Sequence, residues 1–166
     1  MPAVASAAMV SDATAYRYFP DLVSLLREAV MHDWPSPEEA LAPVAGSDDP
    51  VERIGWATQH LLREVVAADR AVRAMISASV VRPDVAGLRP TRRFGLIETA
   101  LAPLEKTLAV TDPAAFGQLK LDLAIIVSAE ALFTLTDLCG LPPEDAIRSA
   151  VHTARAVTAA ALNSLR

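Results

Sequence analysis

The sequence predicts an all-α protein made of a small head followed by a larger helical body. Apolar residues recur at three- and four-residue spacing along most of the chain, which is the pattern of helices with one buried face. Proline, glycine and aspartate interrupt these segments, and no two segments alternate polar and apolar residues as a pair of strands would. The 166 residues fit one compact domain with a small appendage.

The composition limits the classes of function. A hydrophobic fraction of 52% and a mean hydropathy of +0.31 allow a sizeable core and leave apolar surface for a partner. The net charge of −5 argues against a protein that coats nucleic acid or anionic membranes, but it leaves room for one local DNA-binding surface. The single cysteine, Cys139, excludes an internal disulfide bond. We expect its side chain to be buried at a helix end, with a redox switch as the alternative.

Neither a membrane span nor a secretory signal is expected. Residues 119–138 are the most apolar stretch, but they include four charged side chains, which are too many for a span. The first ten residues are apolar and lack the basic segment with which a secretory signal begins. We therefore expect a cytoplasmic protein.

The first 33 residues are expected to form three short helices. The first covers residues 2–8, and Ser11 can cap the second. Pro20 and Asp21 end the second helix, and Asp21 can cap a third that continues to His32. The four prolines of residues 34–50 then indicate a connector with one helical turn near residues 38–41. We therefore assign residues 1–33 to the head, 34–49 to a linker and 50–166 to the body.

The body begins with a strong helix start. Asp49 can cap this helix, Pro50 suits its first turn, and Glu52 lies where a capping box places its carboxylate. Similar starts and stops predict helices over residues 50–68, 69–81, 91–108 with a bend at Pro103, 113–138 closed by Gly140, and 143–166, with a loop over 82–90.

The last two expected helices bear on assembly. The one that ends at Leu138 is apolar almost all round, which is typical of a helix buried on more than one side. The final helix has Ile147, Val151 and Leu162 on one face and many alanines elsewhere. These helices either complete the core of a monomer or form half of a four-helix bundle with a second copy. We favour the homodimer.

Residues 4–21, V-A-S-A-A-M-V-S-D-A-T-A-Y-R-Y-F-P-D, carry the main functional signal. They resemble the helix-turn-helix of the TetR family of transcriptional regulators, with Val4-Ala5 on its second helix, residues 8–11 at the turn and the Thr-x-aromatic-basic pattern on the recognition helix. The resemblance implies an all-helical homodimer that binds operator DNA and whose body binds a small hydrophobic effector. It places the following residues at the DNA: Ser11, Thr14, Tyr16, Arg17 and Tyr18.

Physical chemistry agrees with these roles. Thr14 is short enough to approach a base edge, the hydroxyls of Tyr16 and Tyr18 can donate to phosphate oxygens, and Arg17 can neutralise a phosphate. We expect Val4, Val10 and Phe19 to form the core between the two helices. The alternative is that the aromatic rings of this segment simply pack against a neighbouring part of the chain.

The chain departs from the family pattern in three ways. The family's first helix would precede Met1, Met9 replaces the turn glycine, and Leu22 replaces a lysine that binds phosphate. Residues 1–33 also contain two arginines against four acidic residues. We therefore expect weak or absent DNA binding by this form. The alternative function is a dimeric ligand-binding or interaction module that has lost competent DNA binding.

The resemblance also implies an effector pocket inside the body. Its candidate lining residues are Trp56, His60, Met75, Phe94, Glu98 and Phe133. The carboxylates of Glu98, Asp122 and Glu130 lie among apolar residues, where they either face solvent or an arginine or anchor a ligand. The three histidines have no metal-ligand spacing, and no phosphate loop or nucleophile motif is present. We therefore expect no metal, no cofactor and no enzymatic activity.

Overall fold

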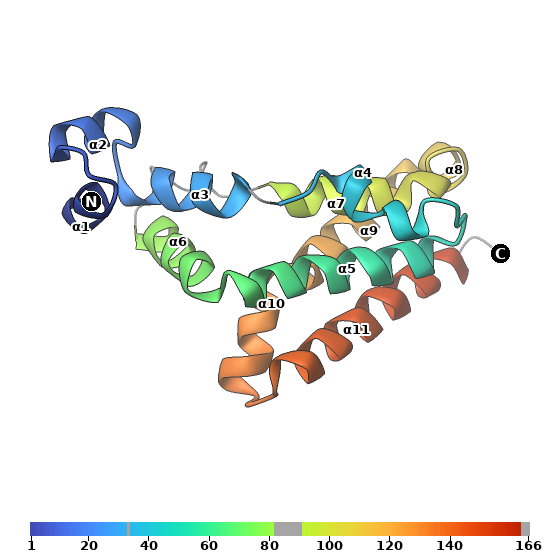
Figure 1. Ribbon diagram of the computed structural model, residues 1–166. Coiled ribbons are helices and arrows are strands. Elements are labelled where there is room, and N and C mark those ends of the chain that lie inside the picture. The colour runs from blue at the N-terminus through green and yellow to red at the C-terminus, as the bar shows by residue number, and fades with distance from the viewer. Residues whose placement is uncertain (33, 82–90, 164–166) are drawn as a thin grey trace. The chain divides into compact units, whose positions relative to one another are not determined.

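The computed structural model of the protein describes residues 1–32, 34–81 and 91–163, and every regular element within these ranges is a helix (Figure 1). The predicted all-α class is therefore confirmed. The chain divides into two compact units. Unit 1 comprises Met1–Trp34 and Ala68–Pro90, and unit 2 comprises Pro35–Ala67 and Thr91–Arg166. The loop predicted over residues 82–90 lies outside the described residues.

Unit 1 is built from α1 (Pro2–Ala7), α2 (Asp12–Tyr18), α3 (Leu22–His32) and α6 (Asp69–Val81). Asp21 caps α3 as predicted, because its Oδ1 accepts from the backbone N–H of Ser24 at 2.7 Å. The core between α3 and α6 is formed by Val23 and Met75, whose side chains are almost fully buried, with Leu26 and Ala78 packed against them.

This packing changes the expected domain boundaries. We assigned residues 69–81 to the body, but the structure places α6 in unit 1, because its apolar face covers α3. The expected linker over residues 34–49 belongs to unit 2 from Pro35 onward. It contains α4 (Pro37–Ala40) and the 3-10 helix η1 (Ala42–Val44), and the side chains of Leu41 and Val44 are buried there. The burial of these two apolar residues makes the segment part of the core.

Unit 2 surrounds the long helix α5 (Pro50–Ala67). The other elements of this unit are α7 (Arg92–Leu101), η3 (Ala102–Leu104), α8 (Leu108–Thr111), α9 (Pro113–Ile126), α10 (Ala129–Phe133), the π-helical turn η4 (Thr134–Leu138) and α11 (Pro143–Asn163). Helix α5 packs against α7 and α11, and α11 also packs against α9 (Figure 1). The centre of the core consists of fully buried aliphatic side chains of three helices: Ile54, Leu62, Leu96, Ile97, Leu101 and Leu123.

A buried arginine joins three of these elements. Arg53 of α5 is only 7% exposed, and its guanidinium donates to backbone carbonyl oxygens instead of pairing with a carboxylate. Nε donates to Ala100 at 3.1 Å, Nη1 to Val44 at 3.0 Å and Nη2 to Thr99 at 2.7 Å. Carbonyl groups in the last turn of a helix have no partner within the helix. Arg53 therefore provides donors for the carbonyl groups at the end of α7 and connects this helix to η1.

Two of the predicted helices are interrupted. The helix expected over residues 91–108 ends at Leu101 and continues as 3-10 helix η3 around Pro103, which cannot donate a backbone hydrogen bond. The helix expected over 113–138 breaks between α9 and α10, where the Oγ of Ser128 accepts from the N–H of Ala131 at 3.1 Å and donates to the carbonyl of Ile125 at 2.7 Å. A side chain that replaces backbone hydrogen bonds allows the chain to leave the helix.

At the end of the segment from α9 to η4, one prediction from the sequence is confirmed and another is wrong. Gly140 has a φ of +69° and closes the helical segment, as predicted. Cys139, however, is exposed, although we expected its side chain to be buried. Cys139 follows η4 directly, and η4 contains no buried residue, so this end of the segment offers no core contact to the thiol.

Candidate functional site

The first candidate site is the pair of short helices at the start of unit 1. The turn from α1 to α2 is made by residues 8–11, and Met9 has a φ of +55°, which is the left-handed region that favours glycine. The N–H of Val10 donates to the carbonyl of Ala5 at 3.0 Å and fixes the end of α1. The turn residue identified from the sequence therefore has the backbone conformation that a glycine normally provides.

The start of α2 is set by Ser11. Its Oγ accepts from the backbone N–H of Thr14 at 3.1 Å and lies 2.8 Å from the Thr14 hydroxyl. Ser11 thus caps α2, as predicted. Because both hydroxyls already have a partner, contact of either with DNA would use their remaining hydrogen-bonding capacity.

The side chains on the outer face of α2 are accessible. Tyr16 is 47% exposed and Tyr18 68%, and the guanidinium of Arg17 lies 5.3 Å from the centre of the Tyr18 ring. The rings of Tyr16 and Tyr18 are therefore accessible, whereas Phe19, which belongs to the same alternative of packing against a neighbouring part of the chain, is partly exposed. Phenol hydroxyls and a guanidinium on one exposed helix can donate to phosphate oxygens.

The core between α1 and α2 differs from the expectation. We expected Val4, Val10 and Phe19 to form it, but Val4 is 39% exposed, Val10 is 43% exposed and Phe19 is partly exposed. The buried side chains are Ala5 and Ala15. Two alanines allow the helices to approach closely, and the larger side chains then remain at the edge of the contact.

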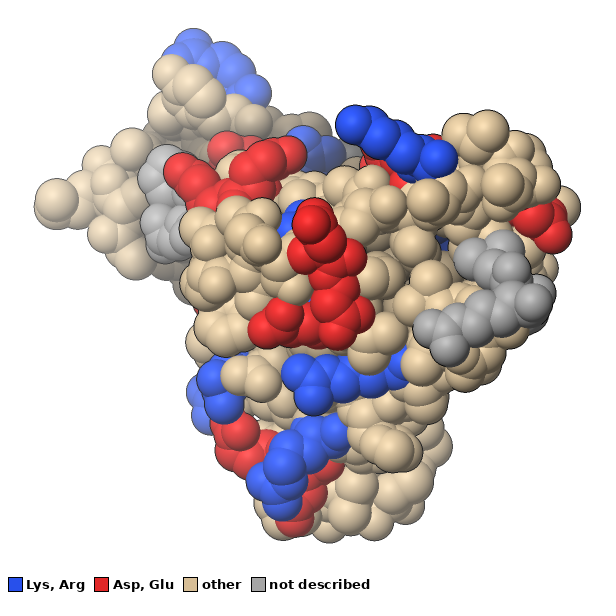
Figure 2. All heavy atoms as spheres, turned by 90° about the vertical axis from the view of Figure 1, so that its right-hand side faces the viewer, with Lys and Arg blue, Asp and Glu red and all other residues tan. Residues whose placement is uncertain are grey.

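The charge of unit 1 differs from that of the first 33 residues. Once the segment that contains α6 is included, six arginines balance six acidic residues, so unit 1 is neutral by sequence and the net charge of −5 belongs to unit 2. On the face of unit 2 that Figure 2 shows, basic and acidic side chains are interspersed. DNA binding by phosphate neutralisation would therefore depend on a local group such as Arg17.

The six candidate effector residues are divided between the two units. Met75 lies in unit 1, where it packs against Val23, whereas the other five lie in unit 2. Trp56 donates from Nε1 to the carbonyl of Ala40 at 2.8 Å, and Glu98 is an exposed partner of Lys120, with Oε1 and Nζ 2.6 Å apart. None of the six lines either of the two grooves described below. The shared effector lining therefore stays a prediction, with five of its residues in unit 2 and Met75 in unit 1.

The remaining candidates of this set have different surroundings. His60 is partly buried, and its Nε2 is buried and makes no hydrogen bond to any of the described residues. Phe94 is 40% exposed, with the Arg93 guanidinium 5.4 Å from its ring centre, and Phe133 is partly exposed. Only His60 therefore offers a buried polar atom to a ligand.

An apolar groove of about 390 Å³ lies between α11 and the segment from α9 to η4. Its lining residues are Ile125, Ile126, Glu130, Ala131, Thr134, Leu135, Ser149, Ala150 and Thr153. Ile125 is 74% exposed, and Leu121 on the same helix is 61% exposed. Both exposed side chains lie on α9, and the groove itself is bounded by the two segments from which the sequence predicts a dimer interface.

The three carboxylates singled out in the sequence all have partners. Glu98 pairs with Lys120, Asp122 accepts from the Gln118 amide at 2.7 Å, and Glu130 lies 3.4 Å from Nη1 of Arg93. These pairs favour the first of the two roles considered, in which the carboxylates face solvent or an arginine. Glu130 also lines the apolar groove.

Within the described residues, no cluster of three or more histidine, cysteine or acidic side chains could hold a metal ion. None of the described helices is long and apolar enough to span a membrane. Comparisons with protein-family models, curated proteins and solved structures found no match to this chain. The α1–α2 pair and the grooves beside α11 are therefore interpreted from their own residues.

Proposed function

We propose that this protein is a DNA-binding transcriptional regulator of the TetR type, a homodimer whose helical body senses a small hydrophobic molecule and controls DNA binding by its heads. The observation that carries the proposal is the turn between α1 and α2. Met9 adopts the left-handed conformation at the position where the TetR motif has glycine, Ser11 caps the next helix, and Tyr16, Arg17 and Tyr18 lie exposed on that helix. A capped helix with exposed donors is suited to the major groove and its flanking phosphates.

The apolar groove beside α11 supports the dimer. Exposed Leu121 and Ile125 form, together with this groove, an apolar surface that a second copy of the same two helices would cover. Two-fold symmetry would bring two heads to one DNA duplex, as two half-sites require. For the effector, His60 is the best-supported candidate in unit 2, because its buried Nε2 makes no hydrogen bond within the part of the chain that the structure describes.

The charge of the head supports a second candidate function. Residues 1–33 contain two arginines against four acidic residues, and unit 1 as a whole is neutral. Phosphate contacts supply much of the affinity of proteins for DNA. The second candidate is therefore a dimeric ligand-binding or interaction module without competent DNA binding.

Binding to DNA separates these two functions. The 166-residue chain, and a form extended by the in-frame codons upstream of Met1, are titrated against labelled DNA that flanks the gene, at about 50 and about 200 mM salt. The regulator requires sequence-selective binding by at least one form, weakened by salt and reduced when Arg17 is replaced. If neither form distinguishes this DNA from a scrambled duplex, the DNA-binding proposal is wrong and the ligand-binding module remains.

A further inference from the structure

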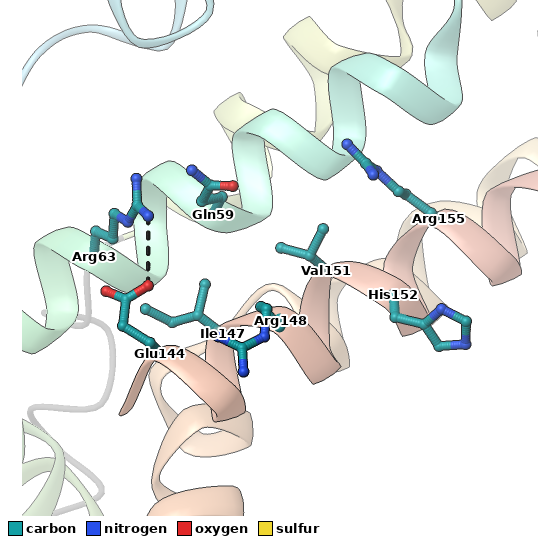
Figure 3. A pocket seen from close by; sticks show the side chains of 8 residues that line it. All are labelled: Gln59, Arg63, Glu144, Ile147, Arg148, Val151, His152 and Arg155. Carbon is teal, nitrogen blue, oxygen red and sulfur yellow. Dashed lines mark hydrogen bonds and ion pairs between the residues drawn. The ribbon is translucent and has the colours of Figure 1, made fainter. Parts of the chain in front are cut away.

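A second groove, lined with arginines, lies on the other side of α11 and faces α5. It has a volume of about 330 Å³, which is within the range of small-molecule sites. Figure 3 shows Gln59 and Arg63 reaching from α5 and Arg155 reaching from α11 toward α5, with Ile147 and Val151 between them. The remaining lining residues are Glu144, Arg148 and His152.

The arginines of this groove differ in their partners. Nη2 of Arg63 lies 3.4 Å from Oε2 of Glu144, and Arg148 pairs with Asp145 of its own helix. Arg155 forms no ion pair or hydrogen bond with any part of the chain that the structure describes. One guanidinium at the end of the groove is therefore available to an anion from solution.

The side chain of Arg155 occupies the space beside Gly55 of α5. A Cβ added to Gly55 would lie 2.2 Å from Nε of Arg155 and 2.9 Å from its Cζ. The Arg155 side chain therefore lies directly against the backbone of α5, in space that any other residue at position 55 would occupy. Arg155 is exposed as a residue, so its guanidinium lies against α5 and is also accessible from solvent.

The floor of the groove is apolar. Ile147 is 2% exposed and Val151 is partly exposed, and both lie between the arginine-bearing ends of the groove. A ligand that fits these surroundings has an anionic group for Arg155 and an apolar part for the floor. Guanidinium groups bind carboxylates and phosphates through two parallel hydrogen bonds, which gives such a contact both strength and orientation.

We propose that the groove between α5 and α11 binds a small organic anion, with its carboxylate or phosphate monoester at Arg155 and its apolar part on Ile147 and Val151. The sequence contained a weak signal for this site, because Arg148 and Arg155 are seven residues apart on one helix and Gln59 and Arg63 are four apart on another. Without the packing of α5 against α11, nothing in the sequence joins these two pairs. The site does not depend on DNA binding by the head.

The test uses the full chain, labelled with ¹⁵N, and three probes with the same ring. Benzoate and phenyl phosphate carry the two anionic groups, and benzyl alcohol is the neutral control. We expect at least one anion to shift the amide resonances of the groove residues on α5 and α11, and benzyl alcohol to bind at least about tenfold more weakly. Comparing the two anions identifies which anionic group the site prefers.

Variants test whether anion binding depends on the guanidinium of Arg155. Arg155→Gln is expected to weaken binding of the preferred anion about tenfold, while Arg70→Gln, at an exposed arginine of unit 1, leaves it unchanged. Gly55→Ala is expected to weaken binding as well, because its Cβ displaces Arg155 while position 155 keeps its charge. The spectra of the variants check that each remains folded.

Three results would overturn the proposal. The first is that neither anion shifts these resonances, the second is that benzyl alcohol binds as tightly as the anions, and the third is that Arg155→Gln binds like the unmodified chain. None of these results changes the DNA titration above, so failure of the anion site and failure of the proposed regulator are distinguishable.

Discussion

Nη2 of Arg53 donates to the backbone carbonyl oxygen of Thr99 at 2.7 Å and so connects the middle helix of unit 2 to the last turn of α7. The same guanidinium also donates to the backbone carbonyl oxygens of Ala100 and Val44. A guanidinium has five N–H donors, and a single carboxylate would accept from only some of them. Here three backbone carbonyl groups of two elements accept from three different nitrogen atoms of Arg53. One buried side chain therefore determines how three segments meet.

Replacing Arg53 should destabilise the protein strongly. Arg53→Met keeps an unbranched side chain of similar length, but it leaves buried carbonyl groups of η1 and α7 without a donor. We expect the free energy of unfolding to fall by about 2–4 kcal/mol, measured by urea denaturation followed by circular dichroism. Arg70→Met, at an exposed position of α6, is the control and should change it by less than about 0.5 kcal/mol. Equal stability of the two variants would contradict the role assigned to Arg53.

Met9→Gly should stabilise the α1–α2 turn. Met9 has a φ of +55° and is 92% exposed, so glycine removes backbone strain and loses little packing. We expect a gain of about 0.5–1 kcal/mol, measured as greater protection of the α1 and α2 amides from hydrogen exchange. Ala8→Gly is the matched control, because Ala8 has right-handed helical angles and should lose protection instead. A loss of protection in both variants would show that Met9 is not strained.

Ile125→Glu should weaken self-association. Ile125 is 74% exposed beside the apolar groove, so the charge is tolerated in a single chain but would be buried without a partner at the proposed dimer interface. We expect a dimeric mass for the unmodified chain and a shift toward the monomer for the variant, measured by light scattering after size-exclusion chromatography. Val80→Glu, on α6 and 68% exposed, should not alter the mass. A monomeric mass for the unmodified chain would exclude the dimer at the concentration used.

Arg17→Ala should weaken DNA binding to all sequences by a similar factor. Arg17 is exposed at the end of α2, where it can neutralise one phosphate. The slope of log affinity against log salt should therefore become shallower by about one for each head that contacts DNA. Arg70→Ala, in the same unit, is the control. A loss of affinity restricted to one DNA sequence would instead indicate that Arg17 reads a base.

Most helix boundaries could be predicted because their signals are local. Ser11, Asp21 and Gly140 each act through hydrogen bonds or backbone angles within a few residues, and each has the predicted role. The break at Ser128 was missed because the apolar pattern continues through it. A serine within an apolar stretch does not by itself predict whether the helix continues or breaks, because the outcome depends on the surrounding packing.

Features that depend on distant residues could not be predicted. Met75 was grouped with the residues of the body by its position in the chain, but its packing against Val23 places it in unit 1. The contact of Arg155 with Gly55 joins residues that are a hundred positions apart, and neither has a distinctive neighbourhood in the sequence. The turn at Met9 was predicted, but the burial of Ala5 and Ala15 was not, because small side chains give a weak signal.

The chain contains two tyrosines, and both lie exposed on α2. Selective isotope labelling of tyrosine would therefore give resonances from that short helix alone. A change in either ring would report contact at this surface without an attached dye or any alteration of the chain. The composition thus supplies an intrinsic spectroscopic reporter at the position where the proposed regulator would meet its DNA.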